Sequence, residues 1–431
     1  MAETQVPPLS NRMNDIIQTL LPAAAAAAAD HAEPNPEVVN LSVADNQLIR
    51  SELLDICKSA IAKDLTQETF NYPMGLGGDP SLMQAISSFF NTYFKPSTPV
   101  TPDHLVVAAG AGFSLDALAS SICEPGDSIL VPGPCWNSFG AYIYCHAGVR
   151  LVPVYPAPYS AALTSHTLIP ALEAAYDGAA DPKRIKGLII CNPHNPFGQC
   201  YSKSALQAVL KWCAQKGLHY ISDEVYGGME FGRDTKSDKF VSALSLLDGS
   251  SDSKNGTTFD RSKLHVLWSA SKLFGIPGIR LGCLITQANP MVRIGSIIST
   301  YNQSSSLSAL LLTHLLNSVE LPALLSKNNA LLAKSYDLLS STLTRLGIEF
   351  LPANAGFVVF AKFVKNAKSW EDEAALVQGL KEHKVIVSAG KGFAGADEEK
   401  GWVRITLAVP WEQFSEGIKR IENFFLESGL A

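Results

Sequence analysis

The sequence predicts an α/β protein, with a mostly parallel sheet in a large domain and a smaller α+β section after it. From His104 onward, short apolar runs alternate several times with helical segments, which favours a parallel sheet with helices on both faces. After Thr286 the pattern becomes helical and then closes with short strands and a last helix. With 431 residues, the chain is also too long for one simple core.

Seven short apolar runs are the expected strands of the large sheet, and amphipathic segments between them are the expected helices. The strands are predicted at 105–108, 128–131, 149–155, 187–191, 219–222, 264–268 and 279–286. Helices are predicted at 81–93, 115–122 and 204–216, then at about 290–326 and 331–346. The smaller section should contain strands at 357–363, 385–387 and 403–407 and a final helix at 411–428. The polar stretch 234–262 is expected to be a surface excursion.

Composition excludes several classes of protein. The net charge is −6 and no Lys/Arg cluster is dense enough to follow a phosphate backbone, so no nucleic-acid partner is expected. The apolar patch at 16–29 contains Pro22 and is too short to span a bilayer, so no membrane partner is expected either. Its alanine run either extends a helix or lies in a flexible arm. The eight cysteines form no C-x-x-C pair, which predicts reduced thiols in a cytoplasmic enzyme without a metal site.

One lysine lies where a buried strand passes into a glycine-rich turn. The stretch is Trp268-Ser-Ala-Ser-Lys-Leu-Phe-Gly, and it brings Ser269 and Lys272 close to the cation Arg280. A lysine amine can condense with a carbonyl, while hydroxyls and an arginine hold a phosphate dianion. This combination points to pyridoxal phosphate (PLP). Taken alone, the motif more often belongs to a surface loop with a solvated lysine.

Other strand ends carry residues that suit the same site. Asp223 follows an apolar strand, where a carboxylate is costly to bury without a cationic partner such as a protonated pyridine nitrogen. Asn195 lies in the rigid loop Asn192-Pro-His-Asn-Pro-Phe-Gly, and Trp136 follows another strand end. Gly110-Ala-Gly could begin a dinucleotide fingerprint, but Leu115 replaces its third glycine, which disfavours a dehydrogenase.

The motifs Asn-Pro-x-Asn-Pro-x-Gly, Asp-Glu-x-Tyr and Ser-x-Ser-Lys occur in this order, and together they resemble the fold-type I PLP enzymes of the class I/II aminotransferase family. The resemblance covers nearly the whole chain from about residue 38 onward. It implies three catalytic residues. Lys272 would carry PLP and move the proton of the substrate Cα, Asp223 would keep the pyridine nitrogen protonated, and Tyr226 would bind the phenolic oxygen together with Asn195.

The same resemblance implies how cofactor and substrate are held. Trp136 would stack on the cofactor ring, and Arg404 would bind the α-carboxylate of the substrate, although a lone arginine on a strand is usually a surface residue. The expected phosphate ligands are Ala111, Gly112, Ser269, Arg280 and, from the neighbouring subunit, Tyr72. A homodimer with shared active sites is therefore expected. The domains would be an arm and part of the small domain (1–60), a large PLP-binding domain (61–300) and a C-terminal small domain (301–431).

Within the family, the stretch Leu41-Ser-Val-Ala-Asp-Asn-Gln-Leu looks like the signature of the 1-aminocyclopropane-1-carboxylate (ACC) synthase-like branch, which makes Asp45 a candidate substrate-binding residue. Four positions depart from the family pattern. Asp45 replaces a glutamate, Trp136 a tyrosine, Met83 an arginine, and Gly112 a serine or threonine, so that one hydroxyl contact to the phosphate is lost. The ACC-synthase-like proteins of filamentous fungi are the group that the chain resembles most.

The resemblance implies a reaction through aldimine and quinonoid intermediates. The candidate reactions share these intermediates and differ only in the steps that follow. We expect an aminotransferase that acts on an α-amino acid in the biosynthesis of a secondary metabolite. The main alternative is a C–S lyase, which cleaves a cysteine conjugate by α,β-elimination. A true ACC synthase is the third and least favoured possibility. A protein that keeps the fold without catalysis is disfavoured because the lysine and the aspartate are both present.

Overall fold

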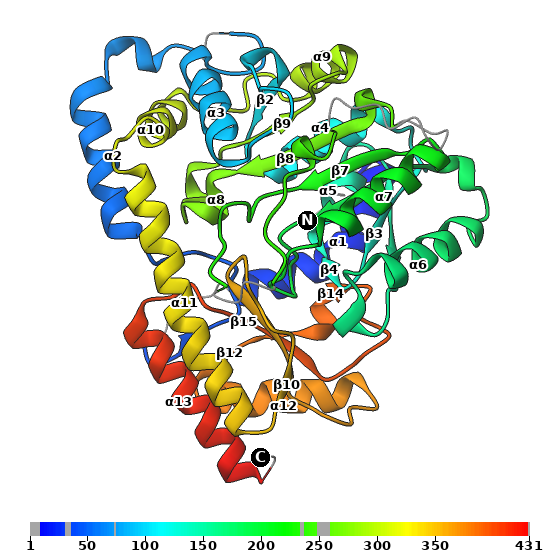
Figure 1. Ribbon diagram of the computed structural model, residues 1–431, viewed down its shortest axis with the longest axis vertical. Helices are drawn as coiled ribbons and strands as arrows, with labels where there is room; N and C mark the ends of the chain where they lie inside the picture. The colour runs from blue at the N-terminus through cyan, green and yellow to red at the C-terminus, as the bar shows by residue number, and fades with distance from the viewer. Residues whose placement is uncertain (1–8, 31–35, 73–74, 233–236, 248–258, 430–431) are drawn as a thin grey trace, which may run out of the picture.

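The chain folds into two lobes, shown in Figure 1, and the long helix α11 (Leu321–Arg345) runs from one lobe to the other. The computed structural model describes residues 9–72 except 31–35, residues 75–247 except 233–236, and residues 259–429; for 22–30 it describes the backbone alone. The upper lobe in Figure 1 holds the large sheet, and the lower lobe holds a smaller one.

The large sheet has seven strands in the order β2-β9-β8-β7-β6-β3-β5, and β9 alone runs against its two neighbours. The predicted fold class is confirmed. The strands are β2 (Leu105–Ala108), β3 (Ser128–Pro132), β5 (Arg150–Val154), β6 (Ile185–Cys191), β7 (His219–Asp223), β8 (Leu264–Ser269) and β9 (Gly282–Ile285). Helices α4 (Ala111–Ile122), α5 (Ser138–Cys145), α6 (Ser165–Asp177) and α7 (Lys203–Lys216) pack against these strands.

Two boundaries near the lysine turn differ from the prediction. Helix α4 begins at Ala111 and not at Leu115. The chain turns into the helix at Gly110, whose φ of 96° is readily adopted only by glycine. Strand β9 begins at Gly282 and not at 279. Before it, Pro277–Ile279 form a 3₁₀ turn, and Arg280 adopts the left-handed conformation with a φ of 53°.

The predicted long helix at 290–326 is wrong. The segment forms α9 (Pro290–Ser299) and α10 (Ser306–Leu316), and α11 then continues without a gap through 326–331. The chain leaves the helical conformation after α9, where Asn302 has a φ of 59°. It turns again before α11, which carries a proline in its first turn, where the missing N–H costs nothing. Apolar periodicity alone did not reveal these turns.

The smaller sheet is antiparallel and has the order β10-β11-β15-β13. Its strands are β10 (Glu349–Phe350), β11 (Val358–Lys362), β15 (Trp402–Thr406) and β13 (Ser388–Ala389). Helices α12 (Trp370–Glu382) and α13 (Trp411–Ser428) complete the lobe. A short pair, β14 (Phe393–Ala394) with β4 (Cys135–Trp136), links it to the large lobe.

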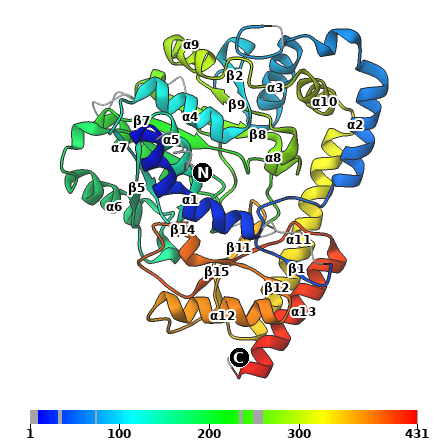
Figure 2. The same cartoon turned by 180° about the vertical axis from the view of Figure 1, so that it is seen from behind.

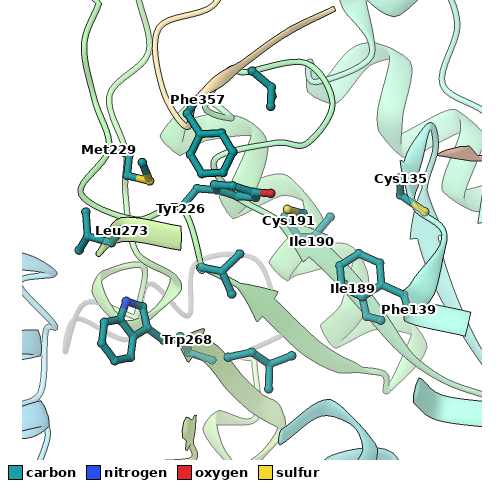
Figure 3. Close-up of a cluster of buried hydrophobic side chains, with 14 of the residues drawn as sticks. Cys135, Phe139, Ile189, Ile190, Cys191, Tyr226, Met229, Trp268, Leu273 and Phe357 are labelled. Carbon is teal, nitrogen blue, oxygen red and sulfur yellow. The ribbon is translucent and has the colours of Figure 1, made fainter. Parts of the chain in front are cut away.

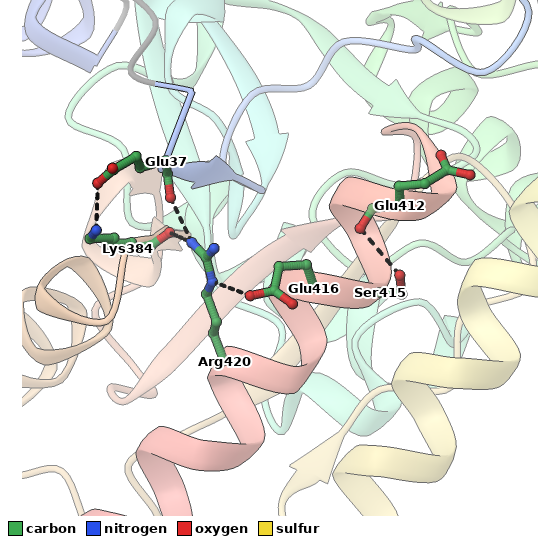
Figure 4. Close-up of polar contacts among 6 residues, drawn as sticks. All are labelled: Glu37, Lys384, Glu412, Ser415, Glu416 and Arg420. Carbon is green, nitrogen blue, oxygen red and sulfur yellow. Dashed lines mark hydrogen bonds and ion pairs between the residues drawn. The ribbon is translucent and has the colours of Figure 1, made fainter.

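The start of the chain contacts both lobes. Helix α1 (Asn11–Asp30) includes the alanine run and packs against α5, on the face turned toward the viewer in Figure 2. Strand β1 (Val39–Asn40) then pairs with β12 (Val385–Ile386) of the small lobe. Figure 4 shows how Arg420 of α13 donates to the main-chain oxygens of Glu37 (2.7 Å) and Lys384 (3.2 Å). The division of the chain at residues 60 and 300 stays a prediction.

Within the described ranges, no single helix is long and apolar enough to cross a membrane; α10 and α11 meet these conditions only as a pair bent by 87°.

Part of the stretch 234–262, predicted to be a surface excursion, is buried. Ala243, Leu244 and Leu246 are at most 5% exposed, and the Ala243 N–H donates to the carboxylate of Glu224 at 2.7 Å. This buried anchor was not predicted, because the surrounding sequence is polar. Residues 233–236 and 248–258 of the same stretch lie outside the described residues.

Gly198, at the end of the Asn-Pro loop, fixes that loop against β11. Its φ is +69°, and an added Cβ would lie 2.1 Å from the main-chain oxygen of Val358. We predict that Gly198→Ala lowers the free energy of unfolding by about 2–4 kcal/mol, from left-handed strain and overpacking. Urea denaturation measures this change. Gly392→Ala is the matched control, since nothing lies near its Cβ position; equal stability of both variants would contradict the prediction.

Candidate active site

A cavity opens where β6, β7 and β8 end. These three strands are parallel, so their carboxyl ends meet at one edge of the sheet, where open α/β sheets place their ligands. Nine residues that the sequence singled out line this cavity: Ala111, Gly112, Trp136, Asn195, Asp223, Tyr226, Ser269, Lys272 and Arg280. The structure therefore brings together side chains that lie up to 169 residues apart in the sequence.

Lys272 lies in the short helix α8 (Ala270–Leu273), directly after β8. Its Nζ donates to the main-chain oxygen of Ala44 at 2.7 Å. Burial of the ammonium group, together with the positive charge of Arg404, lowers the pKa of Lys272 from 10.5 to about 8. Near neutral pH a much larger share of this lysine is therefore a neutral amine than at the ordinary pKa, and the neutral amine is the state that attacks a carbonyl.

Asp223 is buried at the end of β7 with few partners. Its carboxylate accepts one long hydrogen bond, of 3.4 Å, from the Val225 N–H, and burial raises its pKa from 3.8 to about 7. Cys191 lies beside it in register on β6. A buried carboxyl of this kind is stabilised by a cation, and a protonated ring nitrogen entering the cavity would supply one.

Tyr226 projects from the loop after β7 into an apolar setting. Figure 3 shows its ring below Phe357 and close to Cys191; the centroids of Tyr226 and Phe357 are 5.3 Å apart at an interplanar angle of 77°. Burial raises the pKa of the Tyr226 hydroxyl above its usual value. The phenol is therefore neutral and can donate a hydrogen bond to an oxygen in the cavity.

The opposite end of the cavity is suited to an anion. The first-turn N–H groups of α4 have no partner within the helix, and the helix dipole adds positive charge there. Arg280 lies beside Gly110 and donates to the main-chain oxygen of Ala109 at 2.8 Å. Ser269 is 3% exposed and adds a hydroxyl. These donors fit a phosphate group, and with Lys272 and Asp223 they fit PLP as a whole.

Arg404 lies on β15 of the small lobe and is 6% exposed, so it is a buried residue and not a surface one; it does not line the cavity itself but contacts Asn195, which does. Its guanidinium donates to Asn195 Oδ1 (3.1 Å), to the Ser42 main-chain oxygen (2.5 Å) and to Ser388 Oγ (3.1 Å). It lies 5.2 Å from the centre of the Phe393 ring, and burial lowers its pKa. None of these partners is a carboxylate, so the guanidinium retains an uncompensated charge that a carboxylate ligand could pair.

Besides Arg404, two predicted residues do not line the cavity, Asp45 and Tyr72. The Asp45 carboxylate forms an ion pair with Arg50, and its Oδ1 is buried without a hydrogen-bond partner. Tyr72 is 83% exposed and does not line the cavity. The prediction for Tyr72 concerns a neighbouring subunit, and that for Asp45 a bound substrate; both stay predictions.

The sequence did not reveal the residues that support Lys272 and Arg404 from the 42–46 segment. Asn46 is fully buried, and its side-chain amide donates to the main-chain oxygens of Lys272 and Leu273, both at 3.2 Å, and to Asn328 of α11 at 2.8 Å. Together with the Ser42 and Ala44 oxygens, Asn46 ties the lysine turn, the arginine and α11 together. These partners are more than 200 residues away in sequence, so no local spacing could have shown them. Tyr142 and Phe139 of α5 also line the cavity and were not predicted.

Comparison with known proteins agrees with this geometry. The family profile described as aminotransferase class I and II matches residues 36–421. The chain is 40% identical over 417 residues to the probable aminotransferase aclI of Aspergillus oryzae, covering 96% of this chain and 97% of that protein. It is 30% identical to the probable inactive 1-aminocyclopropane-1-carboxylate synthase-like protein 2 of Mus musculus, over 88% of this chain and 64% of that one. The expected resemblance to fungal aminotransferases and to the ACC-synthase-like branch is confirmed.

The fold is similar to that of aspartate aminotransferase from Thermus thermophilus, solved with maleate. The TM-score is 0.72 at 20% sequence identity, and the superposition covers 97% of this chain and all of that one. At this identity the likeness concerns the fold alone, and it agrees with the fold-type I arrangement expected from the sequence.

We predict that Asp223 makes the stability of the cofactor-free protein depend on pH. Because the pKa of this carboxyl is raised from 3.8 to about 7, the folded state keeps a proton that the unfolded chain releases between these values. The free energy of unfolding should therefore fall as the pH rises from about 4 to about 7, and Asp223→Asn should make the fall shallower. Part of the fall should remain in this variant, because burial also raises the pKa of Glu224 to about 7.

Urea denaturation at about pH 5 and about pH 7 measures this difference. The exposed Asp397→Asn serves as the control and should leave the dependence unchanged. If Asp223→Asn lost as much stability between the two pH values as the unsubstituted protein does, the carboxyl would not titrate in this range.

Proposed function

Because the chain belongs to the class I and II aminotransferase family and is an aminotransferase, we propose that it binds PLP and transfers the amino group of an α-amino acid to a keto acid. The single observation that best supports this proposal is the cavity itself. It combines a lysine with a lowered pKa, a buried carboxyl with a raised pKa, and a cluster of phosphate donors. A C–S lyase and an ACC synthase would need the same cofactor site, but the aminotransferase relatives favour transamination over both.

The residues divide the work between binding and proton movement. PLP, when bound, accepts the electrons released at the substrate Cα. Asp223 keeps a proton on the ring nitrogen, Tyr226 and Asn195 donate to the phenolic oxygen, and Trp136 covers one face of the ring. Lys272 would hold the cofactor and, once the substrate has released it as a free amine, would accept the proton of the substrate Cα on its Nζ. Arg404 binds the α-carboxylate and so fixes the orientation of the Cα–H bond.

We also propose a homodimer in which Tyr72 completes the phosphate site of the partner. Several large apolar side chains of this lobe are strongly exposed, which favours an interface: Phe70 (79%), Leu76 (63%), Ile298 (72%) and Tyr301 (74%). The segments that carry Phe70 and Tyr301 are close to each other, because the hydroxyl of Ser306 donates to the main-chain oxygen of Asn71 at 3.0 Å. We place the enzyme in the cytoplasm and, from its similarity to a fungal aminotransferase, in the biosynthesis of a secondary metabolite.

A half-reaction tests the proposed chemistry. PLP-loaded protein is mixed with a panel of amino acids and cysteine conjugates, without a keto acid, while cofactor absorbance and ammonia are followed together. An aminotransferase should convert its cofactor to the amine form once, stop after one equivalent, and resume when a keto acid is added. Continuous release of ammonia with unchanged cofactor would establish a lyase instead.

We predict that the capture of PLP by the cofactor-free protein accelerates with pH and levels off above about pH 8. Only the neutral amine of Lys272 reacts, and its pKa is about 8 and not the ordinary 10.5. Stopped-flow absorbance measures the rate. Arg404→Gln should move the midpoint of this pH profile to higher pH, because the positive charge of Arg404 lowers the pKa of Lys272. Asp45→Asn should move it to lower pH, because the negative charge of Asp45 raises that pKa. Midpoints that do not respond to either change would contradict this account.

We predict that Arg404→Gln raises the KM for amino acids by about 100-fold, which corresponds to the loss of about 3 kcal/mol of charge-assisted hydrogen bonding to the carboxylate. PLP affinity should stay within a few-fold of the original value, because Arg404 lies outside the phosphate cluster. Steady-state kinetics with an amino acid and with the matching amine, which lacks the carboxylate, provide the measurement. If the substitution slowed both substrates equally, Arg404 would not bind the carboxylate.

A further inference from the structure

Gly112 and Tyr142 occupy one volume at the anion end of the cavity. Gly112 lies in the first turn of α4, and Tyr142 lies in α5, which packs against α4. A Cβ added at Gly112 would lie 2.3 Å from Cζ of Tyr142, and 2.5 and 2.6 Å from its two Cε atoms. The tyrosine ring, at its hydroxyl-bearing end, therefore fills the space that any side chain at position 112 would need.

The ring of Tyr142 is held by two aromatic neighbours. Its centroid is 5.6 Å from that of Phe113, at an interplanar angle of 76°, and 5.9 Å from that of Trp136. It lines the same cavity as Arg280 and Ser269. Within the described part of the chain, its hydroxyl has no hydrogen-bond partner. Tyr142 thus lines the cavity with a hydroxyl that has no partner in the described residues, close to the first turn of α4, whose N–H groups have no partner within the helix.

We propose that Tyr142 is a phosphate ligand of this enzyme, and that its hydroxyl supplies the hydrogen bond that Gly112 cannot make. The inference rests on the proposed function, because it requires PLP as the ligand. A phosphate dianion gains from each charge-assisted hydrogen bond, and a phenol is a good donor to it. Tyr142 and Gly112 act as a pair: the absence of a side chain at 112 makes room for the ring, and the ring replaces the missing hydroxyl.

Equilibrium binding of PLP and of pyridoxal, which lacks the phosphate, tests this role without any turnover. Tyr142→Phe should weaken PLP binding about tenfold or more and leave pyridoxal binding unchanged, since only the contact to the phosphate is lost. Tyr144→Phe, on the same helix, removes the same atom and should change neither. Equal weakening of both ligands in Tyr142→Phe would mean that the ring acts by packing alone, and unchanged PLP binding would mean that it makes no contact; either result overturns the proposal.

An exchange of the two residues provides a second test. Gly112→Ser alone should strongly weaken PLP binding, because its Cβ overlaps the ring of Tyr142. Adding Tyr142→Ala should restore the affinity to within a few-fold of the original, since the serine hydroxyl then has both the space and the position. If the double variant bound PLP no better than Gly112→Ser, the two residues would not be exchangeable and the pairing would be wrong. Failure of the unsubstituted protein to bind PLP would contradict the proposed function itself.

Discussion

The site depends on burying charged groups in and beside one cavity without letting them neutralise one another. Lys272 donates to a main-chain oxygen, Asp223 accepts from a main-chain N–H, and the guanidinium of Arg404 is held by oxygens of neutral groups. Had the lysine and the aspartate formed a direct ion pair, both pKa values would have moved away from neutrality. The neutral partners instead leave the amine reactive, the carboxyl in need of a cation, and the guanidinium open to a carboxylate.

Both lobes are needed to maintain this arrangement. The large sheet delivers Asp223 and Lys272 to one edge because β7 and β8 are parallel neighbours. Arg404 comes from the antiparallel sheet of the other lobe. The 42–46 segment connects the two, since its main-chain oxygens accept from Arg404 and Lys272 and its Asn46 side chain contacts α11. The position of the arginine relative to the lysine therefore depends on how the two lobes pack against each other.

The parts of the structure that could be predicted are those written locally in the sequence. The buried strands β6, β7 and β8 are short and mostly apolar, so their positions and the polar residues at their ends followed directly. The turns between α9, α10 and α11 were missed because the prediction followed the apolar periodicity of the flanking helices. The polar stretch at 299–306, where Asn302 has a positive φ, and Pro322 were the local signals that could have shown them. The buried stretch at Ala243 was missed because the sequence around it is polar. What buries it is a contact distant in sequence, the hydrogen bond from the Ala243 N–H to the carboxylate of Glu224. Tyr142 was missed because its role arises from Gly112, 30 residues earlier.

The central claim is that one lysine, enclosed among neutral partners, carries the cofactor. Borohydride reduction of the PLP-loaded protein, followed by proteolysis and mass spectrometry of the labelled peptide, tests this claim directly. We expect the label on the peptide that contains Lys272, at about one equivalent per chain, and we expect its loss in Lys272→Ala. Label on any other lysine, or undiminished labelling of Lys272→Ala, would contradict the account of the site given by its geometry.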